Sequence, residues 1–211
     1  MIVNLADKEV SFKIVYYGPG LCGKTTNLLQ IYSRIGNDKG EMISLANRED
    51  RTIFFDFASF DIGKLGDFSV KFSIYTVPGQ SVYKVTRKLV LKGVDGVVFV
   101  ADSAPNRFRS NLVSMQEMAE HLQEVAGVSI KDVPMVIQYN KRDLPDALPL
   151  EVLGKINVGN VPAIEAVAVR GEGVMETLNA IVSLVLSKYA PAVRGKGKRK
   201  RRKRKESRRA R

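Results

Sequence analysis

Eight consecutive residues near the N-terminus combine three glycines with a lysine and a threonine. They run Gly18-Pro19-Gly20-Leu21-Cys22-Gly23-Lys24-Thr25 and fit the pattern G-x-x-x-x-G-K-[ST]. Glycines let the backbone curl until successive N–H groups point inward at phosphate oxygens, and a following helix adds the partial positive charge of its N-terminus. In such a loop, Lys24 would reach the β- and γ-phosphates and Thr25 would ligate Mg²⁺. The alternative is a glycine-rich turn that merely precedes a helix.

A second polar segment, Asn140-Lys141-Arg142-Asp143, directly follows an apolar run. An exposed carboxylate at Asp143 can accept hydrogen bonds from the N1–H and the N2 amino group of guanine. Adenine lacks this pair of donors, so the contact would select GTP over ATP. Asn140 would brace the loop and the base edge, and the stem of Lys141 would cover the face of the base. Alone, these residues also fit a polar turn after a strand.

Two shorter segments would complete a nucleotide site. Thr76-Val77-Pro78-Gly79-Gln80 follows a β-rich run. There the Gly79 N–H would bind a γ-phosphate, and Gln80 would orient an attacking water. Further along, Glu165-Ala166-Val167-Ala168 ends a short strand, and the Ala168 N–H would donate to guanine O6.

These segments must be positioned by alternating strands and helices. The predicted strands are Ser11–Tyr17, Thr52–Phe60, Phe68–Thr76, Val94–Ala101, Val133–Tyr139 and Ala163–Ala168. The predicted helices are Lys24–Ile35, Gln80–Lys92, Arg107–Val125, Leu150–Ile156 and Val174–Tyr189. This order predicts an α/β fold, with a mostly parallel six-stranded sheet, one antiparallel edge strand and helices on both faces. The stretch 36–51 is polar and reads as irregular.

The charge of the chain is concentrated at its C-terminal end. The formal net charge is +12, but residues 194–211 alone hold 13 of the 34 basic residues and one of the 22 acidic ones. The remainder is therefore neutral, and we expect one domain over residues 1–193 and a disordered basic tail over 194–211. No apolar run approaches the roughly 18 residues of a membrane span. The single cysteine excludes an internal disulfide, and the single histidine, His121, is expected on the surface of a helix.

Taken together, the motifs resemble those of the Ras-like small GTPases, and more narrowly the MglA-like bacterial small GTPases. The resemblance covers about residues 3–190, but not the tail. The segments that carry it are Phe12–Asn27, Arg51–Phe57, Tyr75–Gln80, Gly93–Arg107 and Asn140–Leu148. It implies a cytoplasmic, monomeric P-loop GTPase domain that slowly hydrolyses GTP to GDP with Mg²⁺. It also implies a role in cell polarity or gliding motility, and recruitment to a cell pole or to the inner face of the membrane.

The resemblance also assigns roles to single residues. Thr52 matches a switch-loop threonine that ligates Mg²⁺ together with Thr25, and Arg51 matches an arginine finger supplied in cis, although a solvated loop arginine is the plain alternative. Ras-like proteins carry Asp where Thr76 stands, so magnesium would depend more on Thr25, Thr52 and the phosphates. A dimeric roadblock-type partner, MglB-like, would move Arg51 and Gln80 into place. The expected catalytic residues are Gln80, Arg51 and Lys24. The expected nucleotide contacts are Gly18, Gly20, Leu21, Cys22, Gly23, Lys24, Thr25, Thr26, Thr52, Gly79, Asn140, Lys141, Asp143, Val167 and Ala168.

Other functions remain open from the residues alone. One is a GTP-dependent scaffold with almost no turnover, which Thr76 suggests because it replaces the aspartate of Ras-like proteins. Another is a P-loop ATPase or kinase, which would make Asn140 and Asp143 accidental. The tail would bind an anionic membrane, nucleic acid or an acidic protein, or would be solvated without a specific role. No aromatic residue interleaves its cations, which argues against base stacking, and it carries no cysteine for prenylation.

Overall fold

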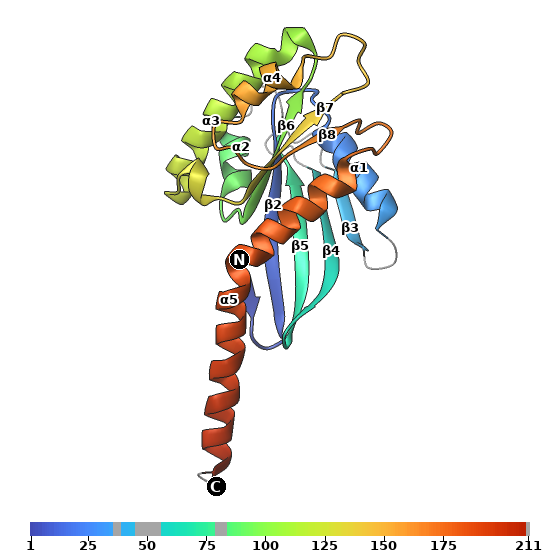
Figure 1. Cartoon of the computed structure of the whole chain (residues 1–211). Helices are drawn as coiled ribbons and strands as arrows, with labels where there is room; N and C mark the ends of the chain where they lie inside the picture. Colours follow the sequence, from blue (N-terminus) through green and yellow to red (C-terminus); the bar gives the residue numbers. More distant parts are fainter. Residues whose placement is uncertain (36–38, 45–55, 79–83, 210–211) are drawn as a thin grey trace.

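A twisted sheet forms the centre of the molecule (Figure 1). The computed structural model describes residues 1–35, 39–44, 56–78 and 84–209. Within these residues the sheet has eight strands in the order β3-β4-β5-β2-β6-β7-β8, and β1 pairs with β2 beside this path. The strands are β1 Ile2–Asn4, β2 Glu9–Tyr17, β3 Lys39–Ser44, β4 Asp56–Leu65, β5 Phe68–Thr76, β6 Gly96–Asp102, β7 Met135–Asn140 and β8 Ala163–Ala166.

Helices connect the strands. The α-helices are α1 Lys24–Arg34, α2 Lys84–Leu91, α3 Phe108–Ala126, α4 Leu150–Leu153 and α5 Val174–Arg209, with short 3₁₀ turns η2 Pro105–Arg107, η3 Ile130–Asp132 and η4 Gly154–Ile156. β2 pairs in parallel with both β5 and β6, and β6–β7 and β7–β8 are also parallel. β1–β2, β3–β4 and β4–β5 are antiparallel.

The central strands owe their place to their composition. β6 and β7 are buried at every position, as expected for parallel strands that helices cover on both faces. β5 instead alternates buried and half-buried residues along its length. Apolar side chains on both faces of the middle of the sheet therefore require two layers of helices.

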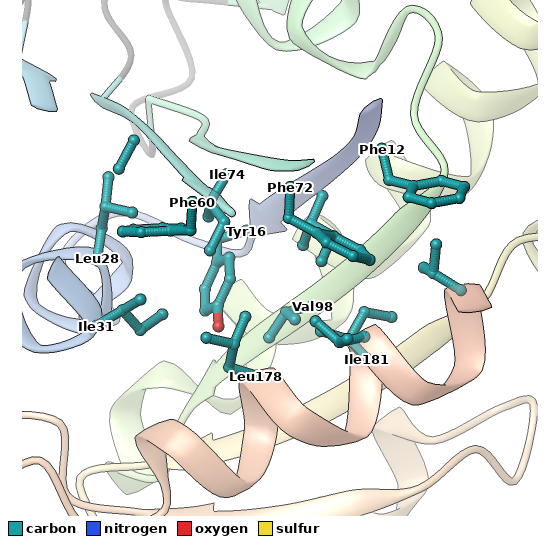
Figure 2. Close-up of a cluster of buried hydrophobic side chains, with 14 of the residues drawn as sticks. Phe12, Tyr16, Leu28, Ile31, Phe60, Phe72, Ile74, Val98, Leu178 and Ile181 are labelled. Carbon is teal, nitrogen blue, oxygen red and sulfur yellow. The ribbon is translucent and has the colours of Figure 1, made fainter. Parts of the chain in front are cut away.

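Each face of the sheet packs against its own helices. On one face, α1 and α5 close over β2, β4, β5 and β6. Figure 2 shows Leu28 and Ile31 of α1 and Leu178 of α5 near Tyr16, and Ile181 of α5 beside Val98. On the other face, α2, α3 and α4 cover β2, β6 and β7 through residues such as Leu91 and Met118. The outcome is a three-layer α/β domain, which confirms the predicted fold class.

The sheet is larger than we predicted. In the described part of the chain it holds eight strands rather than six, and its antiparallel part comprises three pairings rather than one edge strand. The two additional strands are β1 and β3, and β3 lies in the stretch that we read as irregular. An edge strand is held chiefly by main-chain hydrogen bonds to one neighbour, so the polar sequence Lys39–Ser44 can pair without an alternating apolar pattern.

The C-terminal segment continues α5, which runs to Arg209 and includes Pro191. That residues 194–211 form a separate, disordered basic tail stays a prediction. Figure 1 shows the last part of α5 projecting away from the sheet. Lysine and arginine favour helix, and extending a helix that already exists avoids the cost of nucleation. Within the described residues, no helix combines the length and the apolar character needed to cross a membrane.

Candidate nucleotide-binding site

The predicted motifs meet at one edge of the sheet. β2 runs directly into Gly18, β6 ends at Asp102, β7 ends at Asn140, and β8 ends at Ala166. These strands are parallel neighbours in the sequence β2, β6, β7, β8, so their carboxyl ends lie side by side. In open α/β sheets this edge is where ligands bind.

At two positions of the glycine-rich loop, no residue larger than glycine fits. Gly18 has a φ of +147°, and a Cβ there would overlap the carbonyl oxygen of Val100. Gly23 has a φ of +102°, and a Cβ there would overlap Nδ2 of Asn140. Leu21 also takes a positive φ, of 63°, and its side chain is 89% exposed. The loop therefore curls tightly between β2 and α1, as the motif predicted.

The Lys24 side chain turns back into the loop. It is buried, and Nζ donates to the carbonyl oxygens of Pro19 at 2.7 Å and Gly18 at 3.0 Å. A weaker contact of 3.6 Å joins Nζ to Sγ of Cys22. Burial raises the pKa of the Cys22 thiol, while the Lys24 charge acts in the opposite direction. The thiol is thus a packing group, and the positive charge of Lys24 is fixed against the loop.

A buried amide network holds α1 behind this loop. Asn27 donates to the carbonyl of Gly23 at 2.9 Å, and its side-chain amide exchanges two hydrogen bonds with Gln138 of β7, at 2.8 and 2.9 Å. Gln138 also donates to Oγ1 of Thr177 in α5, at 3.0 Å. Sequence reasoning missed this network, although a glutamine inside the apolar run of β7 was the signal for it.

The guanine side of the predicted site is a small cavity of about 280 Å³. Asn140 is a buried residue in its lining. Its Nδ2 donates to the carbonyl of Cys22 at 2.8 Å, and its Oδ1 accepts the N–H of Ala168 at 2.9 Å. The Ala168 N–H, which we expected to face guanine O6, is therefore engaged with Asn140 here. Asp143 is exposed. The lining residues are Leu21, Gly23, Thr26, Asn140, Lys141, Asp143, Leu144, Ala168 and Val169.

An aspartate that the motifs did not single out lies between the two halves of the site. Asp102 is fully buried at the end of β6, and its Oδ2 lies 2.6 Å from Nζ of Lys141 and 3.7 Å from Nε of Arg107. Its Oδ1 accepts the N–H of Ala104 at 3.1 Å. Arg107 in turn donates from Nη2 to the carbonyl of Gly20 at 2.5 Å. The available signal was an acid that ends an otherwise apolar strand.

A second cavity, of about 750 Å³, adjoins the loop on the side of α2 and α3. Arg87, Arg107 and Arg109 line it together with Glu117, and Arg87 pairs with Glu117 at 2.7 Å.

The remaining predicted residues are placed as follows. Thr25 is exposed in the first turn of α1, and Thr26 beside it is half-buried. Thr76 is buried at the end of β5. Val167, which follows β8, donates its N–H to the carbonyl of Glu172. Four predicted residues lie outside the described part of the chain, namely Arg51, Thr52, Gly79 and Gln80.

The expectation for His121 was wrong. It is 4% exposed and lies 3.0 Å from the hydroxyl of Tyr17, the last residue of β2. Helical spacing explains the error, because His121 lies three residues after the buried Met118 even though its sequence neighbours are polar. Burial lowers the pKa of His121, and the charges of Lys88 and Arg87 act in the same direction.

Comparisons with known proteins agree with this geometry. A model of the ADP-ribosylation factor family matches residues 1–185. The chain is 50% identical over 188 residues to the mutual gliding-motility protein MglA of Myxococcus xanthus, covering 88% of this chain and 96% of that protein. It is 26% identical over 193 residues to human ADP-ribosylation factor-like protein 4A, covering 84% and 85% of the two chains.

Proposed function

The chain belongs to the ADP-ribosylation factor family and is an MglA-like small GTPase, and from this premise we propose that it acts as a GTP-dependent switch in cell polarity or gliding motility. The name of the Myxococcus relative supports the cellular role, since it ties that protein to gliding motility. One observation supports the proposed GTP binding. The glycine-rich loop, which has the sequence pattern of a phosphate-binding loop, and a cavity lined by Asn140, Lys141 and Asp143 lie at the same edge of the sheet.

The proposed guanine selectivity depends on Asp143. Its carboxylate is exposed at the cavity, where a guanine can offer it two N–H donors. Asn140 is buried, and its side-chain amide hydrogen-bonds to Cys22 through Nδ2 and to Ala168 through Oδ1, so we assign it to hold the two loops together. Lys141 borders the same cavity, and its ammonium is drawn to Asp102, which leaves the aliphatic stem to cover a base.

The proposed hydrolysis relies on positioning and charge. Lys24 would neutralise charge on the transferring phosphoryl group, Gln80 would orient the water, and Arg51 would add a positive group. Mg²⁺, when bound, would supply further positive charge at the phosphates. Thr25 suits that ion, because it carries a hard hydroxyl oxygen and is an exposed residue in the first turn of the helix that follows the loop. Thr52 would be its second protein ligand.

Regulation of the switch forms part of the proposal. A roadblock-type dimer would stimulate hydrolysis by bringing Arg51 and Gln80 to the phosphates, and effectors would bind the switch segments in the GTP state. The protein would work in the cytoplasm and reach a cell pole or the inner face of the membrane through its basic C-terminal segment. The boundary near residue 193 separates the proposed GTPase domain from this segment.

Base selectivity is the first test. We expect the parent protein to bind GTP in strong preference to ATP, and Asp143→Asn to shift preference toward xanthosine nucleotides, whose 2-oxo group replaces the amino donor. Asp146→Asn is the matched control, because Asp146 is also an exposed acid, three residues further on. Competition binding would measure both, and equal affinity of the parent protein for ATP and GTP would contradict the assignment.

Turnover is the second test, and it addresses the scaffold alternative, which Thr76 in place of the usual acid favours. We expect Gln80→Leu and Arg51→Ala to keep nucleotide affinity within a few-fold and to lose partner-stimulated phosphate release, since an arginine finger is worth roughly 10³–10⁵ in rate. Arg48→Ala removes the same charge from the same segment and should leave the stimulated rate intact. Negligible release by the parent protein, even with a roadblock-type partner, would support the scaffold instead.

A further inference from the structure

The carboxylate of Asp102 lies between the base side and the phosphate side of the site. Its two oxygens have different partners: Oδ1 accepts a backbone N–H, whereas Oδ2 lies near both Lys141 and Arg107. Lys141 belongs to the loop that lines the proposed guanine cavity. Arg107 belongs to the turn η2, before α3, and reaches the carbonyl of Gly20 in the glycine-rich loop. One buried charge therefore connects two loops that are far apart in the sequence.

The backbone of Asp102, at the end of β6, is held by a side chain other than its own carboxylate. Asn111 of α3 holds it, because Oδ1 of Asn111 accepts the N–H of Asp102 at 3.0 Å and Nδ2 donates to the carbonyl of Asp102 at 2.8 Å. A buried carboxylate is costly unless cations and donors compensate it. Asn111 secures the backbone of Asp102, and Oδ1 accepts the Ala104 N–H, so what the charge on Oδ2 adds is the positioning of two cations.

The contact from Arg107 to Gly20 fixes a donor of the site. A trans peptide is planar, so the carbonyl of Gly20 and the N–H of Leu21 lie in one plane and point in opposite directions. Holding the carbonyl toward Arg107 therefore directs the Leu21 N–H away from it. Leu21 has a positive φ, a conformation that a leucine does not favour by itself, so the loop gains from an external restraint on this peptide.

We propose that Asp102 and Arg107 are positioning residues that join the base loop to the phosphate loop and thereby slow the release of bound guanine nucleotide. The inference rests on the proposed nucleotide site and adds a control of nucleotide lifetime to it. Asp102 orients Lys141 on one side and Arg107 on the other. Arg107 then keeps the Gly20–Leu21 peptide in the orientation that a bound phosphate needs.

The test compares two arginines that line the same cavity. Arg107→Ala removes the link, whereas Arg109→Ala removes an equal charge two residues away, on an exposed side chain in the first turn of α3. The probe is GDP that carries a fluorescent N-methylanthraniloyl group, chased from the full-length protein by excess unlabelled GDP. We expect Arg107→Ala to accelerate dissociation roughly tenfold, as the loss of one charge-assisted hydrogen bond implies, and Arg109→Ala to match the parent.

Three further measurements separate positioning from general stability. Arg107→Lys should give an intermediate rate, because a single ammonium can meet Asp102 or the Gly20 carbonyl but cannot fork between them. The ³¹P resonance of the β-phosphate of bound GDP should shift in Arg107→Ala and stay in place in Arg109→Ala. The side chain of Arg107 is 31% exposed, so Arg107→Ala should fold and melt within a few degrees of the parent.

The outcomes are distinct. Dissociation from Arg107→Ala within twofold of Arg109→Ala overturns the inference while the nucleotide site stands. A faster release that comes with an equally large loss of melting temperature and no ³¹P shift also overturns it, since it would indicate a structural role. Failure of the parent protein to retain labelled GDP overturns the proposed function and the inference together.

Discussion

Asn140 and Asp143 belong to one motif, but the structure predicts opposite consequences for their replacement. Asn140→Ala removes the donor to the Cys22 carbonyl and the acceptor for the Ala168 N–H, and both of those residues are buried. Each buried polar group left unpaired costs about 1–3 kcal/mol, so we expect a loss of about 4 kcal/mol in the free energy of unfolding. Asp143 is exposed, so Asp143→Ala should change stability by less than about 0.5 kcal/mol.

Urea unfolding of the nucleotide-free proteins would measure this difference without the stabilisation that a bound ligand adds. In a chain of this size, the Asn140→Ala variant should also melt about 10 °C below the parent. Nucleotide binding should fall in both variants, since Asp143 would contact the base and Asn140 joins the loops around it. An Asn140→Ala variant as stable as the Asp143→Ala variant would refute the idea that Asn140 is a structural brace.

Three further predictions concern other parts of the molecule. Gly23→Ala should lower stability by about 2 kcal/mol and weaken GDP binding, since the added methyl meets the Asn140 amide at a positive φ; calorimetry would measure both effects, and unchanged values would contradict the loop geometry. Because the pKa of His121 is lowered on folding, stability should be intact above its unfolded value of about 6.5 and decline as the pH falls below it. Urea midpoints between pH 7 and pH 5 should show this decline in the parent and a flatter profile in His121→Gln. Removal of residues 194–211 should leave the melting temperature and hydrolysis nearly unchanged and abolish salt-sensitive sedimentation with anionic vesicles, whereas persistent sedimentation would show that the domain itself binds them.

The sequence predicted those parts of the site that depend on local spacing. The segment from Gly18 to Thr25 needs only its own residues to form a loop between a strand and a helix, and a polar segment after a buried strand places Asp143 at the sheet edge. In the structure, Leu21 and Gly23 of the first segment and Asp143 of the second line one cavity. The α/β architecture also followed from alternating apolar runs, because covering both faces of the middle strands leaves few arrangements.

Contacts between distant elements were not predictable in this way. Asp102 and Lys141 are 39 positions apart, and Arg107 and Gly20 are 87 apart, so no local pattern signals either pair. His121 was assigned from its polar neighbours, although its spacing from Met118 placed it on the buried face of α3. β3 escaped notice because its partner strand, and not its own composition, makes it a strand.

The buried amide network of α1 has a consequence for how this sequence can change over time. Asn27, Gln138 and Thr177 come from a helix, a strand and another helix, and each satisfies a polar group of the next. An apolar residue at any one of these positions leaves the polar groups of the others buried without hydrogen-bond partners. Apolar residues of similar volume at all three positions would be tolerated. The three positions are therefore expected to covary among homologues. Homologues in which one position is apolar should carry substitutions at the other two as well.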